Sequence, residues 1–398
     1  MNNDLSSPWH GSTFSHVENE IKKMLSELSK KANEIDKKCR YLMPLWDDII
    51  AFEDSEIERI LLASSAVNPQ HNEYITKTMA AAATTIPSFR SNTIIEHFDE
   101  LHYFTGLSAF PNYMFGGCTN LKSITLPESS VITDIPTQFM YISNGAFEGD
   151  ITIPDSIVNI RSYAFAGLTN LQHINIPNGL KLIDIVAFSN CSNLELTELP
   201  DGIETIGGTA FQNCSKVALS KLPDNLVIDS SYGAGNSTFR NAGVTITSFP
   251  VGVTYIPNYF LEGTPSNIHY IPDRITYFGN AAFSNTNVTS VILTNTTPPT
   301  LGGNGTTWGN PNTVKIPIFV PSSVVDDYKT ATNWSIWSTH IFTIEAMLAS
   351  PSWTAGTYAL YATVSYNGEI YYSKVNNNTA EPSDTTKWEW IDTDFPHD

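Results

Sequence analysis

A repeat of constant length constrains this chain more than any other feature of its sequence. Prolines recur at a step of 23 residues, at Pro154, Pro177, Pro200 and Pro223. A fixed period of this size is typical of stacked supersecondary units, because each unit buries its apolar side only against its neighbours. The sequence therefore predicts a solenoid, a right-handed coil in which each period adds one short strand to a parallel sheet.

Apolar residues occupy the same slots in each period. A phenylalanine follows the proline by eleven positions, with apolar residues at fixed places between them. A small or sulfur-containing residue, an aliphatic residue and a strand-like segment come after the phenylalanine. Two successive periods show this frame in Leu180, Ile183, Ala187 and Phe188, and then in Ile203, Ile206, Ala210 and Phe211. We expect these residues to stack into one continuous core.

The full pattern, AFxxCxxLxxIxIPxxIxxIxxxAF, resembles the BspA-like class of leucine-rich repeats. The resemblance covers residues 92–295, where eight phenylalanines and seven prolines fall in one frame. Residues 296–350 resemble the C-terminal cap of the same arrays, in which an extended "IPIFVP" precedes the short helix "SSVVDDYKTATNW". The resemblance implies a capped solenoid whose extended surface binds rather than catalyses.

Residues 1–45 are predicted to form an anchor. From residue 15 to residue 42 apolar residues alternate steps of four and three, as in a coiled-coil heptad, although Lys31 and Lys38 occupy two seam positions. Self-association, with a trimer favoured, and docking of an amphipathic helix on a partner are the two alternatives. The candidate anchor and oligomerisation residues are Trp9, Val17, Ile21, Met24, Leu28 and Ile35. The pattern of residues 46–91 predicts mostly helix, and we assign this segment to a helical neck or cap.

Residues 351–398 are predicted to form a separate small module. The alternation in "TVSYNGEIYYSKV" indicates a β-hairpin whose turn is Asn367 and Gly368, since both residues tolerate positive φ. The order of the aromatic residues in this segment is similar to that of carbohydrate-binding modules 5 and 12. The resemblance implies a small all-β fold that contacts glycans.

Aromatic side chains of this module are the candidates for glycan binding, because exposed rings stack on the C–H faces of sugars. The candidates are Trp353, Tyr371, Tyr372, Trp388 and Trp390. The alternative is that the same residues form the core, since a domain of this size depends on its aromatic side chains for stability.

Composition and motifs argue against several other functions. The chain has 21 Lys and Arg residues and 40 Asp and Glu residues, so its net charge is -19. This charge disfavours nucleic acid and anionic lipid as partners. The histidines are scattered without an HExxH pair, and no nucleophile or phosphate-loop motif is present, so we expect no enzyme, catalytic residue, metal or cofactor. Cys191 and Cys214 occupy equivalent slots one period apart, either as small buried residues or as a disulfide.

The fold class expected is α+β: an N-terminal helical or coiled-coil anchor, a leucine-rich-repeat solenoid of parallel β coils and a small all-β C-terminal module. The segment "PWHGSTFSHVENEIKKMLSEL" resembles the start of tail and fibre proteins of Bacteroidota phages, including crAss-like ones. The sequence shows neither a secretory signal nor a membrane-spanning run, so we expect assembly in the host cytoplasm into a virion, on its tail or fibre.

These resemblances predict a non-enzymatic virion protein that attaches to a host surface. Its expected partners are other virion proteins through the N-terminus, further copies of the same chain, and a host-surface glycan or protein. Two alternatives are a bacterial surface adhesin of the BspA type, and a virion spacer or decoration protein that binds only other virion proteins.

Overall fold

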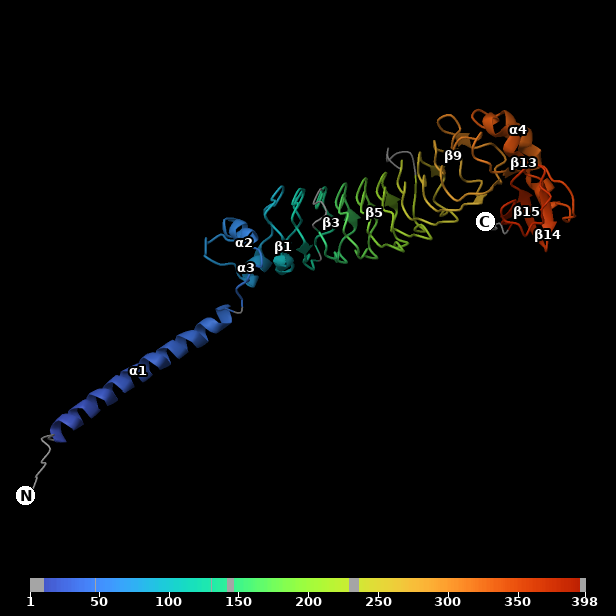
Figure 1. Ribbon diagram of the computed structural model, residues 1–398. Helices are drawn as coiled ribbons and strands as arrows, with labels where there is room; N and C mark the ends of the chain where they lie inside the picture. Colours follow the sequence, from blue (N-terminus) through green and yellow to red (C-terminus); the bar gives the residue numbers. More distant parts are fainter. Residues whose placement is uncertain (1–10, 47, 130, 142–146, 229–235, 394–398) are drawn as a thin grey trace, which may run out of the picture.

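The computed structural model describes residues 11–46, 48–129, 131–141, 147–228 and 236–393; within the first of these ranges, it describes side chains only for residues 19–35 and 37. A long helix extends from one end of a curved stack of coils, and a small β-sheet module lies at the opposite end (Figure 1). The helices are α1 (Gly11–Trp46), α2 (Ser55–Leu62), α3 (Lys77–Ala82), α4 (Val325–Thr330) and α5 (Ile344–Leu348). Short 3₁₀ helices cover Asp99–Tyr103, Ser322–Val324 and Ser335–His340.

Most strands are only two or three residues long. In the coils they are β1 (His97–Phe98), β2 (Ser123–Ile124), β3 (Asp134–Ile135), β4 (Asn159–Ile160), β5 (Leu182–Ile183), β6 (Thr205–Ile206), β7 (Tyr255–Ile256), β8 (Tyr270–Ile271), β9 (Tyr277–Phe278), β10 (Val291–Leu293) and β11 (Thr300–Leu301). The cap adds β12 (Ile318–Val320) and β13 (Ile341–Thr343), and the C-terminal module has β14 (Thr363–Tyr366), β15 (Glu369–Ser373) and β16 (Trp388–Ile391).

The coils stack in parallel, as the repeat predicts. Strands β3, β4, β5 and β6 form one parallel sheet, and its register aligns Ile160 with Ile183 and Ile183 with Ile206. The paired residues are equivalent positions of successive periods, and they point into the solenoid, where they are buried. A parallel β-solenoid of leucine-rich-repeat type is therefore confirmed.

A column of phenylalanine rings fills the interior of the regular coils. Phe165, Phe188, Phe211 and Phe239 stack in sequence, with ring centroids 5.4, 5.4 and 5.7 Å apart and interplanar angles of at most 18°. All four rings are buried. Offset stacking of this kind adds to the stabilisation that comes from removing the rings from water.

Residues 48–91 close the first coil, and helix covers less of them than the sequence predicts. Ile57 and Ile75 belong to the same apolar core as the repeats. Between α2 and α3 the chain turns, because the side chain of Asn68 donates hydrogen bonds to the carbonyl oxygens of Leu62 (3.1 Å) and Asn72 (2.9 Å). Side-chain bonds of this kind compete with helix formation, so only two short helices remain.

Helix α1 confirms the predicted N-terminal helix, and its apolar residues are exposed to solvent. Ile21, Met24, Leu28 and Ile35 are 47–62 % exposed. The helix projects away from the coils (Figure 1).

The other end of the solenoid is closed by tryptophans and by a sheet. Trp334 and Trp337 are buried, and their indole nitrogens donate to the carbonyl oxygens of Pro299 (2.6 Å) and Gly305 (2.7 Å). Strands β12 and β13 continue the parallel sheet of β8 and β10, in the order β13-β12-β10-β8. The expected extended segment and short helix of the cap are β12 and α4.

The C-terminal module is a three-stranded antiparallel sheet in the order β14-β15-β16. Asn367 (φ 53°) and Gly368 (φ 89°) form the turn between β14 and β15, as predicted. Positive φ at both turn residues matches the right-handed twist of the strands that they join.

Candidate ligand-binding cleft

The C-terminal module packs on the outward face of the last parallel sheet. Tyr372 of β15 and Ile391 of β16 share an apolar cluster with Ile292 of β10 and Phe319 of β12. The hydroxyl of Tyr372 also donates a 2.7 Å hydrogen bond to the carbonyl oxygen of Thr289. Burial of these side chains fixes the module against the coils, so that the two parts share one interface.

A cleft of about 700 Å³ lies between the module and the edge of three successive coils. The turns around Leu222, Pro250 and Pro272 form one side, and Trp390 and Asp392 at the end of β16 form the other. The prolines mark the end of each strand segment, so the repeat brings their turns together along one edge. The volume falls within the range of roughly 300–1,000 Å³ that is usual for small-molecule sites.

Trp390 is the exposed aromatic side chain of this cleft. Its side chain is 43 % exposed, and its indole nitrogen donates a 2.8 Å hydrogen bond to a carboxylate oxygen of Glu369 on the neighbouring strand. This hydrogen bond fixes the orientation of the indole relative to the neighbouring strand. Part of the apolar ring therefore remains available to a ligand.

The charged side chains that line the cleft are held by protein partners. Lys221 lies 3.0 Å from a carboxylate oxygen of Asp201 and 3.0 Å from one of Asp224, and these contacts raise the pKa of Lys221. Arg274 donates from Nη2 to the carbonyl oxygen of Phe249 at 2.9 Å. The cleft therefore contains basic groups that are already balanced or positioned by the protein itself.

Two neutral polar side chains, His269 and Asn267, also line the cleft. Nδ1 of His269 lies 3.2 Å from the hydroxyl oxygen of Ser290, and burial lowers the pKa of His269, which favours the uncharged imidazole at pH 7. The side-chain oxygen of Asn267 is buried and has no hydrogen-bond partner among the residues that the structure describes. Buried acceptors normally have a donor, so this oxygen marks a place for one.

The five candidate glycan residues lie in different environments. Tyr372 (2 % exposed) sits in the interface with the coils, and Trp388 (1 %) lies in the module core, where its indole nitrogen donates to the carbonyl oxygen of Ala380 at 2.8 Å. Neither ring has a face open to a sugar, which corrects the expectation for these two. Trp353 and Tyr371 are half-buried, and only Trp390 lines the cleft.

Sequence reasoning missed the half of the cleft that the coils provide. Tyr270, Arg274 and Asn267 belong to the repeat region and come more than a hundred positions before Trp390. The repeated prolines were the sequence feature that could have indicated this side of the cleft, since Pro250 and Pro272 lie in the frame of the repeat. No pattern in the sequence indicated which turns the module would cover.

The predicted anchor residues fall only partly within the described structure. Ile21, Met24, Leu28 and Ile35 are exposed along α1. Trp9 and the side chain of Val17 lie outside the described residues. Oligomerisation through this helix stays a prediction.

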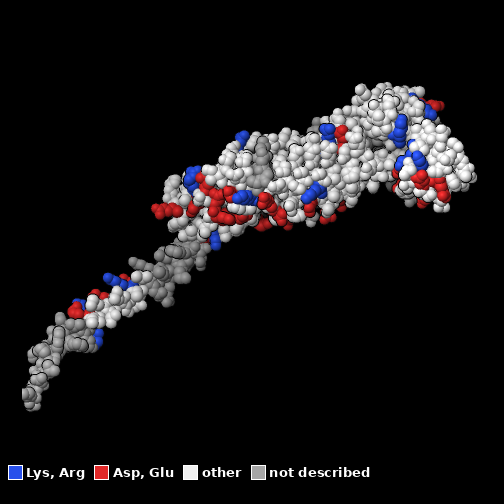
Figure 2. Space-filling model, viewed as in Figure 1, with Lys and Arg blue, Asp and Glu red and all other residues white. Residues whose placement is uncertain are grey.

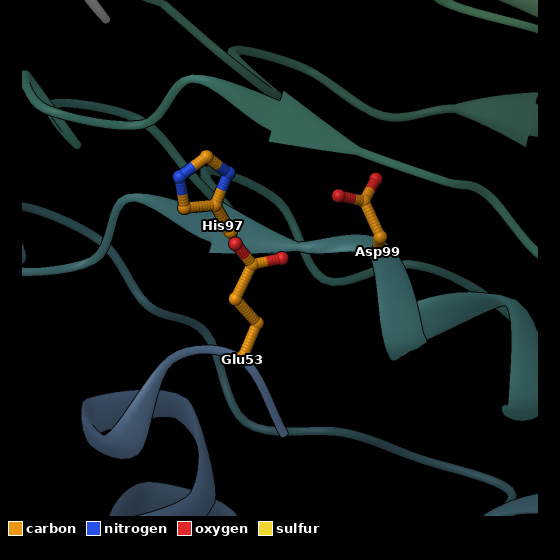
Figure 3. Close-up of side chains that lie close together, drawn as sticks. All are labelled: Glu53, His97 and Asp99. Carbon is orange, nitrogen blue, oxygen red and sulfur yellow. The ribbon is translucent and has the colours of Figure 1, made fainter. Parts of the chain in front are cut away.

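One group of three side chains has the composition of a metal site in the part of the chain that the structure describes. Ligand atoms of Glu53, His97 and Asp99 lie within 4.8 Å of one another (Figure 3). Ser123 donates to Oδ2 of Asp99 (2.6 Å), and its single proton then requires that it accept from Nδ1 of His97 (2.9 Å). Thr125 donates to the other Asp99 oxygen at 2.8 Å. Nδ1 of His97 and both carboxylate oxygens of Asp99 are therefore already used to join neighbouring coils, and we assign no metal here.

Cys191 and Cys214 are free and buried. Their thiols donate to the carbonyl oxygens of Phe165 (3.2 Å) and Phe188 (3.0 Å), each on the preceding coil. Burial raises the pKa of Cys214 to about 12 and raises that of Cys191 well above its usual value. The alternative of small buried residues is the one that the structure shows.

Acidic side chains gather over the coils nearest to α1, and the later coils are mostly uncharged on the same face (Figure 2). Among the described residues, no helix combines the length and the apolar character that crossing a membrane requires.

Comparison with solved structures gives relatives of low identity. A leucine-rich repeat protein from Bacteroides ovatus ATCC 8483 is 20 % identical, with a TM-score of 0.47, over 69 % of this chain and 62 % of its own. A leucine rich cell surface protein from Faecalibacterium prausnitzii A2-165 is 16 % identical, with a TM-score of 0.35, over 60 % of this chain and 82 % of its own. The T. pallidum leucine rich repeat protein is 21 % identical, with a TM-score of 0.31, over 45 % and 70 %. The chain thus spans less than two thirds of the Bacteroides ovatus protein.

Comparison with curated proteins gives no match. The family profile described as "BspA type Leucine rich repeat region" matches in six copies, over residues 141–232 and 225–300. These boundaries include the regular period and the coils that form one side of the cleft. Residues 141–300 of this chain are therefore similar to BspA-type leucine-rich repeats.

Proposed function

We propose that the protein is a non-enzymatic structural component of a phage virion, associated with the tail or with a fibre, that recognises the surface of a bacterial host. The single observation that carries the recognition role is the cleft beside Trp390 of the C-terminal module. This module lies at the end of the solenoid opposite to α1 (Figure 1). A protein that is fixed through α1 would present this cleft outward. The receptor is a host-surface glycan or protein.

The attachment role of α1 rests on its exposed apolar residues and on the resemblance of its sequence to the start of phage tail and fibre proteins. Several copies joined through this helix would display several clefts. Weak contacts made together by linked sites add up to firm attachment, because each further binding event becomes intramolecular.

The experiment that tests this function follows both the particle and its adsorption. Antibodies against the purified protein are applied to phages grown on Bacteroidota hosts, and the purified protein is then used to compete with phage adsorption to the same cells. We expect labelled particles and reduced adsorption. Labelled particles whose adsorption is unchanged would instead indicate a spacer or decoration protein.

A bacterial surface adhesin of the BspA type is the second candidate. The observation that favours it is the match of residues 141–300 to the BspA-type repeat profile. In the same experiment this candidate predicts antibody labelling of bacterial envelopes and no labelling of phage particles.

A further inference from the structure

We propose that the cleft between the coils and the C-terminal module binds an uncharged oligosaccharide, with Trp390 as the stacking residue. This inference rests on the recognition function proposed above and names the ligand class of that site.

The cleft is formed before any ligand arrives. Its two sides are joined through the cluster that contains Tyr372, Ile391 and Ile292, and through the hydrogen bond from Tyr372 to Thr289. A site whose sides are already fixed loses little conformational freedom on binding, which favours affinity for a weakly binding ligand such as a sugar.

The lining has an apolar face beside groups that form hydrogen bonds. Trp390 offers part of an indole ring, and Tyr270 and Pro250 add further apolar surface. Thr247 and Ser248 carry hydroxyls in the same cleft. A pyranose ring has this dual character, with C–H groups on its faces and hydroxyls around its rim, so one ligand meets both halves of the lining.

The absence of charge in the ligand follows from the partners of the charged side chains. Lys221 is held by Asp201 and Asp224, and Nη2 of Arg274 donates to the carbonyl oxygen of Phe249. A carboxylate or sulfate would have to take Lys221 from its two carboxylate partners and would approach Asp224 and Asp392, which also line the cleft. An uncharged ligand has neither cost.

A hydroxyl-rich ligand also accounts for the buried oxygen of Asn267. Asn267 lines the cleft, and its side-chain oxygen is buried without a hydrogen-bond partner among the described residues. A sugar hydroxyl is a donor of the type that this acceptor lacks, and turning of the Asn267 side chain toward the cleft would bring the two together.

The test is calorimetric titration of the intact protein with soluble oligosaccharides. The probes are neutral glucose, mannose, galactose and N-acetylglucosamine oligomers, a uronic-acid oligomer and a proline-rich peptide. We expect a neutral oligosaccharide to bind and Trp390→Ala to weaken it at least about tenfold. Tyr74→Ala is the matched control, because Tyr74 is 40 % exposed and lies between α2 and α3, far along the chain from the cleft.

A second variant separates loss of the cleft from loss of folding. Val251 lines the cleft and is 77 % exposed, so Val251→Glu leaves the core intact and places a charge against the ligand. We expect it to weaken binding of the neutral oligosaccharide as well. The proposal is wrong if the uronic-acid oligomer or the peptide is the only ligand, if no probe binds, or if Trp390→Ala and Val251→Glu both bind like the wild type.

Binding to host cells distinguishes failure of this inference from failure of the function. If the wild type binds cells and Trp390→Ala binds equally well, attachment holds and the ligand site is elsewhere. If the oligosaccharide binds but no host cell does, the site is correct and the attachment function is wrong.

Discussion

The solenoid and helix α1 both carry aliphatic residues at regular spacing, and they use them in opposite ways. In the coils, Ile183 and Ile206 are buried because each coil covers the next. In α1, Leu28 and Ile35 are exposed because the same chain offers them no partner surface among the described residues. The solenoid thus buries its apolar residues within the chain, whereas the apolar residues of the helix can be buried only against another copy or another protein. A periodic apolar pattern therefore indicates either folding or assembly, and only geometry separates the two.

The largest effect is expected in the phenylalanine column. Phe211→Ala removes a buried ring that stacks on Phe188 and Phe239, and the coils on either side cannot close the cavity without disturbing their own strands. We expect the free energy of unfolding to fall by about 3–5 kcal/mol. Urea denaturation followed by circular dichroism measures this change. A loss below about 1 kcal/mol would mean that the column does not hold neighbouring coils together.

The next effect is expected in α1 and concerns assembly instead of folding. Ile21→Ser together with Leu28→Ser removes two exposed seam residues, each worth about 2 kcal/mol if it is buried between copies. We expect the wild type to be an oligomer, with a trimer favoured, and the double variant to be a monomer of unchanged thermal stability. Light scattering after size exclusion measures the mass. A monomeric wild type would remove the self-association hypothesis and leave docking on a different partner.

A smaller effect is expected where the C-terminal module meets the coils. Tyr372→Phe keeps the buried ring but removes the hydroxyl that donates to Thr289. We expect a loss of about 1 kcal/mol, since the carbonyl oxygen loses its donor. Hydrogen exchange should show faster exchange in β15 and β16 and unchanged exchange in β4 and β5. Equal acceleration in all four strands would show that the module and the regular coils unfold as one unit.

The smallest effect is expected from pH at His340, which is buried against Tyr361 of the module. Burial, and then the charge of Lys315, lower the pKa of His340 in the folded protein. The unfolded chain therefore takes up the proton first, and the free energy of unfolding decreases as pH falls below about 6.5. His340→Gln should reduce this decrease by up to about 1 kcal/mol, measured as thermal stability at pH 7 and pH 5. An identical pH dependence in the variant would exclude a role for His340.

The sequence predicted those parts of the fold in which local pattern and final structure coincide. The interior slots, the parallel register and the turn at Asn367 and Gly368 are of this kind. The left-handed turns of the coils are not, because Val186 (φ 61°) and Thr209 (φ 55°) occupy positions where glycine would have been the recognisable signal. Backbone hydrogen bonds to the next coil, such as that from Val186 to Gly208, hold these residues in place.

Only the side of the candidate site that the C-terminal module provides was predictable from the sequence. The aromatic content of the module pointed to Trp390, but burial of Tyr372 and Trp388 depends on where the module docks. Docking is decided by contacts between residues such as Ile292 and Ile391, which are distant in sequence and carry no local signature. The coil side of the cleft therefore became visible only in three dimensions.

Binding to intact cells tests whether the cleft beside Trp390 attaches this protein to a host. Labelled wild type, Trp390→Ala and Tyr74→Ala are added to Bacteroidota cells across a range of concentrations, and bound protein is measured by flow cytometry. We expect saturable binding of the wild type and of Tyr74→Ala, and at least about tenfold weaker binding of Trp390→Ala. Equal binding by all three proteins, or binding by none, would contradict it.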